Sequence, residues 1–231
     1  MKLVLYGGGD AEDNETLDQK LLSLAGKRRP KMTFIPSCSY DAEVDFLDFI
    51  DRFSTYGLTQ FIHFPVDIPF DQVLLKEAFK SDIIYLDGGN TYYFLKYLRK
   101  SKLIPMLKRY LLDGGILAGL SAGAILMTPS IATAGFPEFD KDENYENMKN
   151  LKAMNLVPFE FFPHYKSSRR YDLELIKHSK KIRRPLYASA DGAGIIFDGE
   201  GIQFVGRNFV FNNGQKISMK QKKSFYSQLS K

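Results

Sequence analysis

The 231-residue sequence predicts an α/β protein whose mostly parallel sheet is covered by helices on both faces. Short apolar runs rich in β-branched and aromatic residues alternate with longer segments in which apolar residues recur every three or four positions. The composition, 44% hydrophobic and 26% charged, is ordinary for a globular chain that can bury one sizeable core. We therefore expect a single domain spanning residues 1–231.

The first half of the chain supplies the expected parallel strands and their helices. Each expected helix carries apolar residues at three- and four-residue spacing, which indicates one face packed against the sheet. The expected strands lie at 3–6, 32–36, 58–64, 82–86 and 115–120. The expected helices lie at 14–26, 40–56, 70–80, 91–100 and 102–113.

The second half is more irregular. Residues 128–150 are rich in proline, glycine and acidic residues and have no strong period, so we expect a lid or surface excursion there. A strand at 156–162 and a helix at 171–180 follow, and the basic tail at 220–231 is expected to fray. Late strands are expected at 186–190, 193–198, 202–205 and 208–211, with antiparallel hairpin turns at 199–201 and 212–214.

Charge and hydropathy argue against several classes of partner. The net charge of +5 is modest and its basic residues are scattered, so no nucleic-acid partner is expected. No apolar run reaches the roughly 18 residues that a membrane span needs, and the N-terminus reads as a strand, so we expect a cytoplasmic protein without a membrane partner. The single cysteine, Cys38, excludes an internal disulfide framework and is predicted to be a small packed side chain.

The segment GLSAG, from Gly119 to Gly123, follows the fifth expected strand and matches the GxSxG nucleophile elbow. In that motif small flanking residues let a strand turn sharply into a helix and leave the serine oxygen exposed. A helix beginning at Ala122 would direct its free N–H groups at negative charge that develops beside Ser121. The pattern predicts acyl transfer, with a purely structural strand-to-helix turn as the alternative.

Two glycine-rich loops follow other expected strands and should lie at the same edge of the sheet as Ser121. In DGGNT, at 87–91, Gly89 is the predicted oxyanion donor beside the Ala122 N–H. The first loop, GGGD at 7–10, lacks the third glycine of a dinucleotide fingerprint. Residues of these loops that are predicted to contact substrate are Gly8, Gly88 and Asn90.

A serine nucleophile needs a base, and the chain has three histidines. His164 is the predicted base because it follows an expected strand, whereas His63 lies inside a strand pattern and His178 in a basic helical segment. Asp191, at the end of the next expected strand, is the predicted acid that orients the imidazole. In an α/β-hydrolase the acid would precede the histidine and come from the excursion. The acids that could serve there are Glu138, Asp140 and Asp142.

Together these segments resemble the dipeptidase E (aspartyl dipeptidase) family of serine peptidases, which also includes cyanophycinase-type enzymes. The resemblance covers most of the chain and is far more specific than GxSxG alone. It is carried by GGGD at 7–10, YLDGGNT at 85–91, GLSAGA at 119–124, FPHY at 162–165 and SADGAGI at 189–195.

The resemblance implies a three-layer α/β/α sandwich of the class I glutamine amidotransferase-like, flavodoxin-like type, with no metal or organic cofactor. It implies peptide-bond hydrolysis with Ser121 as nucleophile, His164 as base and an acid where Asp191 stands. Some members are credited with an aspartate soon after the serine, but Ala134, Gly135 and Phe136 stand in that region here.

The family name refers to peptides with an N-terminal aspartate, whose carboxylate needs a cation. Arg169 and Arg170, soon after His164, could form a bidentate clamp; alternatively, the pair opens an exposed helix. A small peptide is thus the expected partner. Other possibilities are an esterase or amidase that uses the same serine, or a silent member that binds a peptide or anion. The oligomeric state is left open.

Overall fold

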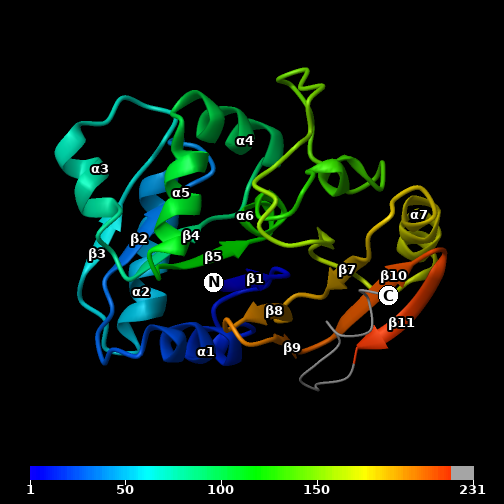
Figure 1. Cartoon of the computed structure of the whole chain (residues 1–231), viewed down its shortest axis with the longest axis horizontal. Helices are drawn as coiled ribbons and strands as arrows, with labels where there is room; N and C mark the ends of the chain where they lie inside the picture. Colours follow the sequence, from blue (N-terminus) through cyan, green and yellow to red (C-terminus); the bar gives the residue numbers. More distant parts are fainter. Residues whose placement is uncertain (220–231) are drawn as a thin grey trace.

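The computed structural model describes residues 1–219, and the expected fraying of residues 220–231 lies outside that range. Its central sheet has seven strands in the order β3-β2-β4-β5-β1-β8-β9 (Figure 1). The first five of these pair in parallel, and β8 and β9 run antiparallel at one end. These strands are β1 (Lys2–Tyr6), β2 (Met32–Ile35), β3 (Phe61–His63), β4 (Ile83–Leu86), β5 (Ile116–Leu120), β8 (Gly194–Phe197) and β9 (Ile202–Val205).

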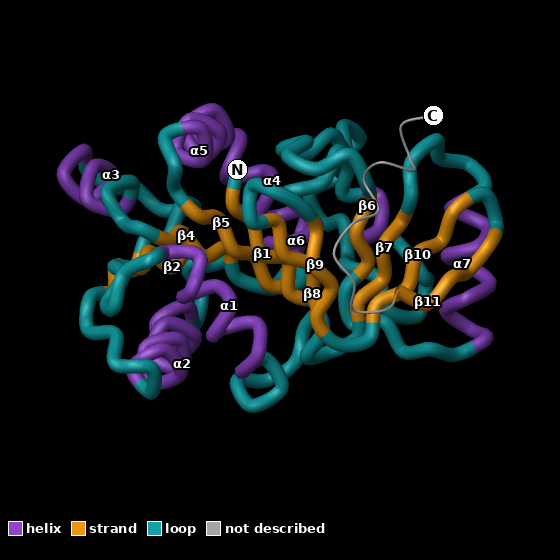
Figure 2. The backbone as a smooth tube through the Cα atoms, turned by 60° about the horizontal axis from the view of Figure 1, so that its bottom comes forward, coloured by secondary structure: helices purple, strands orange, loops and turns teal. Residues whose placement is uncertain are grey.

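Helices cover both faces of this sheet, which confirms the predicted α/β/α sandwich. Figure 2 shows α1 and α2 on one face and α3, α4, α5 and α6 on the other. The two faces bury separate apolar clusters because neighbouring residues along a strand point to opposite sides. The helices are α1 (Glu15–Ala25), α2 (Ala42–Ser54), α3 (Gln72–Ala78), α4 (Thr91–Lys100), α5 (Leu103–Leu112) and α6 (Ala122–Leu126).

A second, four-stranded sheet with the order β11-β10-β7-β6 lies beside the first and was not expected from the sequence. Strand β8 occupies the free edge of β1, so β6 and β7 pair with each other in parallel and β7 pairs with β10. Helix α7 packs on this sheet over an apolar cluster of its own. Its elements are β6 (Glu160–Phe162), α7 (Arg169–Ser179), β7 (Leu186–Ser189), β10 (Asn208–Asn212) and β11 (Gln215–Met219).

The observed bounds differ from the predicted ones mainly in the strands. The expected strands at 58–64 and 156–162 shrink to three residues each, β3 and β6. Two expected hairpins form, β8–β9 and β10–β11, at the predicted turns. The turn at 212–214 was expected without bounds for the strand that follows it, because β11 is a largely exposed edge strand with few apolar residues. The excursion at 128–150 contains one short 3-10 turn, η1 (Ala132–Gly135), and otherwise no helix or strand, as expected.

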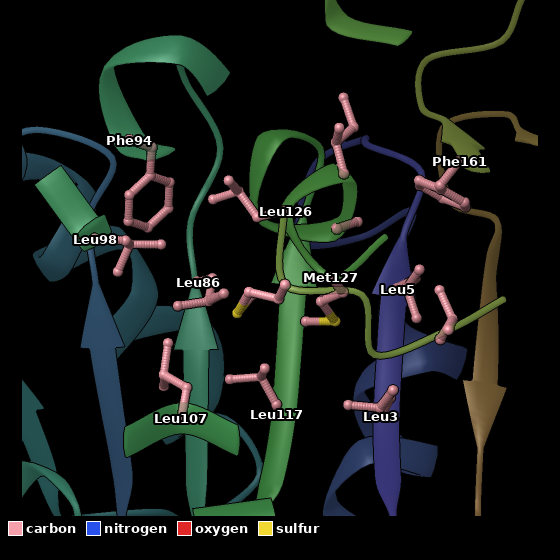
Figure 3. Packing of buried hydrophobic residues seen from close by; sticks show 14 of the residues in the cluster. Leu3, Leu5, Leu86, Phe94, Leu98, Leu107, Leu117, Leu126, Met127 and Phe161 are labelled. Carbon is pink, nitrogen blue, oxygen red and sulfur yellow. The ribbon is translucent and has the colours of Figure 1, made fainter. Parts of the chain in front are cut away.

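The core beneath the elbow anchors the short helix α6. Leu126 and Met127, at its end, are fully buried. They lie against side chains of the neighbouring strands, among them Leu5, Leu86 and Leu117, in the packing that Figure 3 shows. Because this interior is close-packed, the turn that carries Ser121 is held in one position. Within residues 1–219, no helix is long and apolar enough to cross a bilayer.

On the opposite face, a buried ion pair joins α1 to α2. The Asp18 side chain is fully buried and accepts hydrogen bonds from Arg52 Nε at 2.7 Å, Arg52 Nη2 at 2.5 Å and the Tyr6 hydroxyl at 2.9 Å. The guanidinium also lies 5.2 Å from the centre of the Phe53 ring. The Arg52 guanidinium is therefore paired with Asp18 and lies beside the rings of Tyr6 and Phe53.

Asp18→Ala should destabilise the protein by about 3–5 kcal/mol, because it leaves the Arg52 charge buried without its partner. The measurement is the free energy of unfolding in urea, beside Glu15→Ala as a control on the exposed face of the same helix. The control should change the free energy by no more than about 0.5 kcal/mol. Equal losses in the two variants would contradict the role assigned to the pair.

Candidate active site

Ser121 sits on a sharp turn between β5 and α6, as the elbow motif predicts. Its backbone has φ 49° and ψ −106°, a conformation that residues other than glycine rarely adopt. The turn can close because Gly119 and Gly123 have no Cβ. A Cβ on Gly119 would lie 2.5 Å from the backbone of Gly123, and one on Gly123 would lie 2.2 Å from the Leu86 carbonyl oxygen. The two motif glycines are therefore required by close backbone contacts.

The end of β1 positions both Ser121 and His164. The Ser121 N–H donates to the Tyr6 carbonyl at 3.1 Å, and the His164 N–H donates to the next carbonyl, that of Gly7, at 2.6 Å. His164 also has a positive φ, 50°. It follows β6 of the second sheet, not a strand of the central sheet as expected, and these backbone bonds bring it to the elbow nonetheless.

The three predicted catalytic side chains are in contact. His164 Nε2 lies 2.9 Å from Ser121 Oγ, and His164 Nδ1 lies 2.7 Å from Asp191 Oδ1. The carboxylate therefore accepts a hydrogen bond from the Nδ1–H group, and Nε2 is left to accept the serine proton. The His164 and Asp191 side chains are each 45% exposed, so the arrangement opens to solvent. This geometry suits nucleophilic attack by Ser121.

The remaining histidines have other surroundings. His178, in the last turn of α7, has its Nε2 2.7 Å from Oε2 of Glu160 in β6. His63 stacks on Phe46 with ring centres 4.7 Å apart, and burial lowers the pKa of its imidazole. Cys38 is half-buried beside the Tyr40 carbonyl.

The alternative acids of the excursion have other partners. Asp140 accepts from the Tyr171 hydroxyl at 2.6 Å, Asp142 accepts from the Thr91 N–H at 2.7 Å, and Glu138 pairs with Lys141 at 2.7 Å. Among the candidate acids it is therefore Asp191 that contacts the imidazole.

Gly8 lies against the imidazole and carboxylate instead of lining the substrate cavity. Its φ is 129°, and an ideal Cβ there would fall 2.2 Å from His164 Nδ1 and 2.3 Å from Asp191 Oδ1. Its carbonyl accepts the Gly192 N–H at 3.0 Å, which ties down the loop that carries Asp191. The GGGD loop is thus a support for the histidine and the acid, a role that sequence reasoning missed.

A cavity of about 660 Å³ opens in front of Ser121, within the range of small-ligand sites. Gly89, His164 and Asp191 line it, as expected. Most of its other wall comes from the excursion at 128–150, which sequence reasoning treated only as a lid or surface loop. The lining residues that were not predicted include Thr91, Ile125, Thr133, Phe136, Phe139, Lys141, Phe162 and Lys166.

The other predicted substrate contacts are placed differently. Gly88 is close to Ser121, since a Cβ there would lie 3.8 Å from Ser121 Cβ. Asn90 caps α4 by accepting from the Tyr93 N–H at 2.9 Å. Its amide also donates to the Glu143 carbonyl at 2.8 Å, which holds the excursion in place. The Asn90 side chain is therefore committed to the wall of the site.

Arg169 and Arg170 are exposed at the start of α7 and do not line the cavity. The Arg170 guanidinium lies 3.2 Å from the centre of the Phe139 ring. The cations that do line the cavity are Lys141 and Lys166. The predicted arginine clamp therefore does not line the cavity beside Ser121, and Arg170 instead stacks on Phe139, a residue of the cavity wall.

Asp87 directly follows β4 and lines a second cavity, of about 580 Å³, together with Asp45 and Arg52. Burial raises the pKa of the Asp87 carboxyl to about 7. Between pH 4, where the carboxyl ionises in an unfolded chain, and pH 7, the folded protein retains a proton that the unfolded protein has lost. The stability contribution of the protonated carboxyl is therefore lost as the pH rises through this window.

The effect of Asp87→Asn on the free energy of unfolding should accordingly be more stabilising, or less destabilising, at pH 8 than at pH 5. The difference between its effects on the free energy of unfolding at these two pH values should be about 1–3 kcal/mol. Urea unfolding of the variant and the wild type at both pH values measures it. The same effect at both pH values would show that Asp87 ionises as freely in the folded state as in the unfolded state.

Among residues 1–219, no group of three histidine, cysteine, aspartate or glutamate side chains is arranged to hold a metal ion.

Comparison with protein families finds a model, described as peptidase family S51, that matches residues 3–205.

Relatives with curated names are also peptidases. The chain is 28% identical over 202 residues to "Uncharacterized peptidase YgaJ" of Bacillus subtilis, with 85% of this chain and 83% of the relative covered. It is 32% identical over 95 residues to "Peptidase E" of Shewanella sp. strain MR-4, with 41% and 38% covered.

Solved structures show the same fold. A Listeria monocytogenes protein described as a candidate Peptidase E superposes with a TM-score of 0.71 at 24% identity, covering 88% of this chain and 97% of the other. A peptidase from an acI-B1 actinobacterium gives a TM-score of 0.68 at 16% identity, covering 94% and 96%.

Proposed function

The chain belongs to peptidase family S51, and from this premise we propose that it is a serine-type peptidase that hydrolyses short peptides through an acyl-enzyme. The observation that carries the proposal is the contact chain from Ser121 Oγ through the His164 imidazole to Asp191. Its two distances, 2.9 Å and 2.7 Å, lie within hydrogen-bond range for the proton transfers that serine catalysis needs.

In the proposed reaction, His164 Nε2 takes the proton of Ser121 Oγ as the oxygen attacks a peptide carbonyl. Asp191 stabilises the imidazolium that forms and keeps the Nδ1 proton in place. The imidazolium then protonates the leaving amine, and a water molecule activated by the same imidazole hydrolyses the acyl-enzyme. The family's peptidase activity and the open cavity in front of Ser121 support a peptide as the substrate.

Backbone N–H groups are the proposed oxyanion donors. The Gly123 N–H donates to the Asp87 carbonyl at 3.1 Å and is therefore committed. Within residues 1–219, the N–H groups of Ala122 and Gly89 have no hydrogen-bond acceptor. Ala122 follows the nucleophile directly and Gly89 lines the cavity, so these two can bind the charge that develops on the carbonyl oxygen.

A preference for N-terminal aspartate remains a prediction. The arginine pair that motivated it lies outside the cavity, so Lys141 or Lys166 would have to bind the substrate carboxylate. The Lys141 ammonium is already 2.7 Å from Glu138 and 3.9 Å from Glu143. A comparison of kcat/KM for Asp-X and Leu-X dipeptides tests this preference directly.

The proposed chemistry is tested by incubating the protein with a dipeptide and tripeptide library and with a fluorophosphonate probe. We expect hydrolysis of unblocked short peptides. We also expect the probe to form a covalent adduct on the proteolytic fragment of the protein that contains Ser121. Turnover of esters without any peptide hydrolysis would favour a different serine hydrolase. The absence of both labelling and turnover would favour a catalytically silent member that binds a peptide or anion.

A further inference from the structure

Asn14 occupies the N-cap position of α1, but its side chain does not cap the helix. An asparagine at this position usually accepts a hydrogen bond from an N–H group of the first helical turn. The Asn14 side chain is instead fully buried, and its oxygen, Oδ1, has no hydrogen-bond partner within residues 1–219. Capping of α1 therefore does not account for this residue.

The Asn14 amide nitrogen, Nδ2, donates to the loop that follows β1. It lies 3.1 Å from the Gly8 carbonyl oxygen, 2.9 Å from that of Gly9 and 2.9 Å from that of Asp10. Three acceptors thus converge on one amide group, and Oδ1 in the same place would be repelled by all of them. Asn14 therefore holds this loop from inside the protein.

The same loop contacts the acid and the base. The Gly8 carbonyl accepts a second hydrogen bond, from the Gly192 N–H at 3.0 Å, next to Asp191. A Cβ on Gly8 would lie 2.2 Å from His164 Nδ1 and 2.3 Å from Asp191 Oδ1. The main chain that Asn14 holds therefore packs directly against the hydrogen bond between the two side chains.

The composition of the loop explains why it needs such support. Residues 7–9 are three successive glycines, and φ is 129° at Gly8 and 91° at Gly9. Glycine loses more conformational freedom on folding than any other residue, so hydrogen bonds to its main chain are needed to hold one conformation. Loss of the Asn14 amide should therefore allow the loop to move, and Asp191 with it.

Resting on the proposed peptidase function, we propose that Asn14 is a positioning residue, which holds Asp191 against His164 Nδ1 through the Gly8 carbonyl. The three bonds from Asn14 Nδ2 and the packing of Gly8 against the acid and base carry this assignment. Asn14 does not line the substrate cavity. It should therefore affect the orientation of the base, and thus kcat, and leave KM nearly unchanged.

The first measurement is the kinetics of Asn14→Ala with the best dipeptide from the library. Because a small misplacement of catalytic groups is costly, kcat should fall by on the order of 10²-fold while KM stays within about two-fold. Asn14→Ser retains one hydroxyl donor and should lose less. It also carries the test if the alanine variant does not fold. A wild-type kcat in either folded variant would overturn the proposal.

Leu21→Ala is a matched control for destabilisation of α1. Leu21 is fully buried in the apolar cluster beneath the helix, so its truncation should cost about 2–5 kcal/mol of stability. The folded control should nevertheless keep at least half of the wild-type kcat. An equal loss of kcat in the control would show that weakening α1 is sufficient, and the assignment of Asn14 would be wrong.

The same substitution in an Asp191→Ala background distinguishes positioning from a general loss of structure. If Asn14 acts through Asp191, its effect disappears once the acid has been removed. Asn14→Ala should then lower the residual kcat by less than about three-fold. A loss as large as in the wild-type background would mean that Asn14 acts independently of the acid, contrary to the proposal.

The proton on the imidazole gives a readout that needs no activity. In protein labelled with nitrogen-15 at histidine, NMR spectra report which ring nitrogen carries the proton, and His164→Gln assigns the His164 signals. The wild type should carry it on Nδ1, facing Asp191, whereas Asn14→Ala should also populate the Nε2–H form. An unchanged tautomer in folded Asn14→Ala protein would overturn the role of Asn14. A changed tautomer, in a protein whose wild type hydrolyses no peptide, would overturn the peptidase function alone.

Discussion

Ser121→Ala should lower kcat for peptide hydrolysis by on the order of 10⁴- to 10⁶-fold while leaving the fold intact. The alanine cannot attack the carbonyl, so the covalent path is lost, and only binding and the oxyanion donors remain to favour hydrolysis by water. The serine oxygen contacts His164 and the cavity, not the core. Its removal should therefore leave the unfolding temperature close to that of the wild type.

The measurement is the initial rate of hydrolysis of the best dipeptide from the library, with unfolding temperatures recorded in parallel. Ser168→Ala is a matched control, because Ser168 is exposed and its side chain makes no capping hydrogen bond at the start of α7. The control should keep at least half of the activity. A folded Ser121→Ala protein with wild-type turnover would exclude Ser121 as the nucleophile.

The contact between Ser121, His164 and Asp191 was predictable because each signal is local. The small residues around Ser121 predict a tight turn, and His164 and Asp191 each follow a β-favouring run. Strand-end placement was then enough to suggest that the three groups meet. The three side chains do lie in contact, even though His164 follows a strand of a second sheet that was not expected from the sequence.

Features that depend on long-range packing were not predictable. The second sheet arises because β8 takes the edge of β1, a choice between competing pairings that no local pattern determines. The arginines at 169–170 were interpreted as a clamp because they follow His164 closely, but they are exposed at the start of α7 and do not line the cavity.

The role of Gly8 also depends on such packing, and it leads to a second large expected effect. Gly8→Ala should lower kcat by on the order of 10³- to 10⁴-fold, as much as loss of the acid from a catalytic triad. The added Cβ would lie 2.2 Å from His164 Nδ1 and 2.3 Å from Asp191 Oδ1, the two atoms of their hydrogen bond. The imidazole and the carboxylate cannot both keep their positions beside that methyl group.

The same substitution would also strain the backbone, independently of these close contacts, because φ at Gly8 is 129°. Gly114→Ala isolates that contribution: its φ is 96°, but a Cβ there meets no heavy atom within 4 Å. Gly114 precedes β5 at the end opposite the elbow, so its variant should lose stability and keep full activity. If Gly8→Ala protein were folded and retained more than a tenth of the wild-type kcat, then the hydrogen bond between His164 and Asp191 would not be what orients the base.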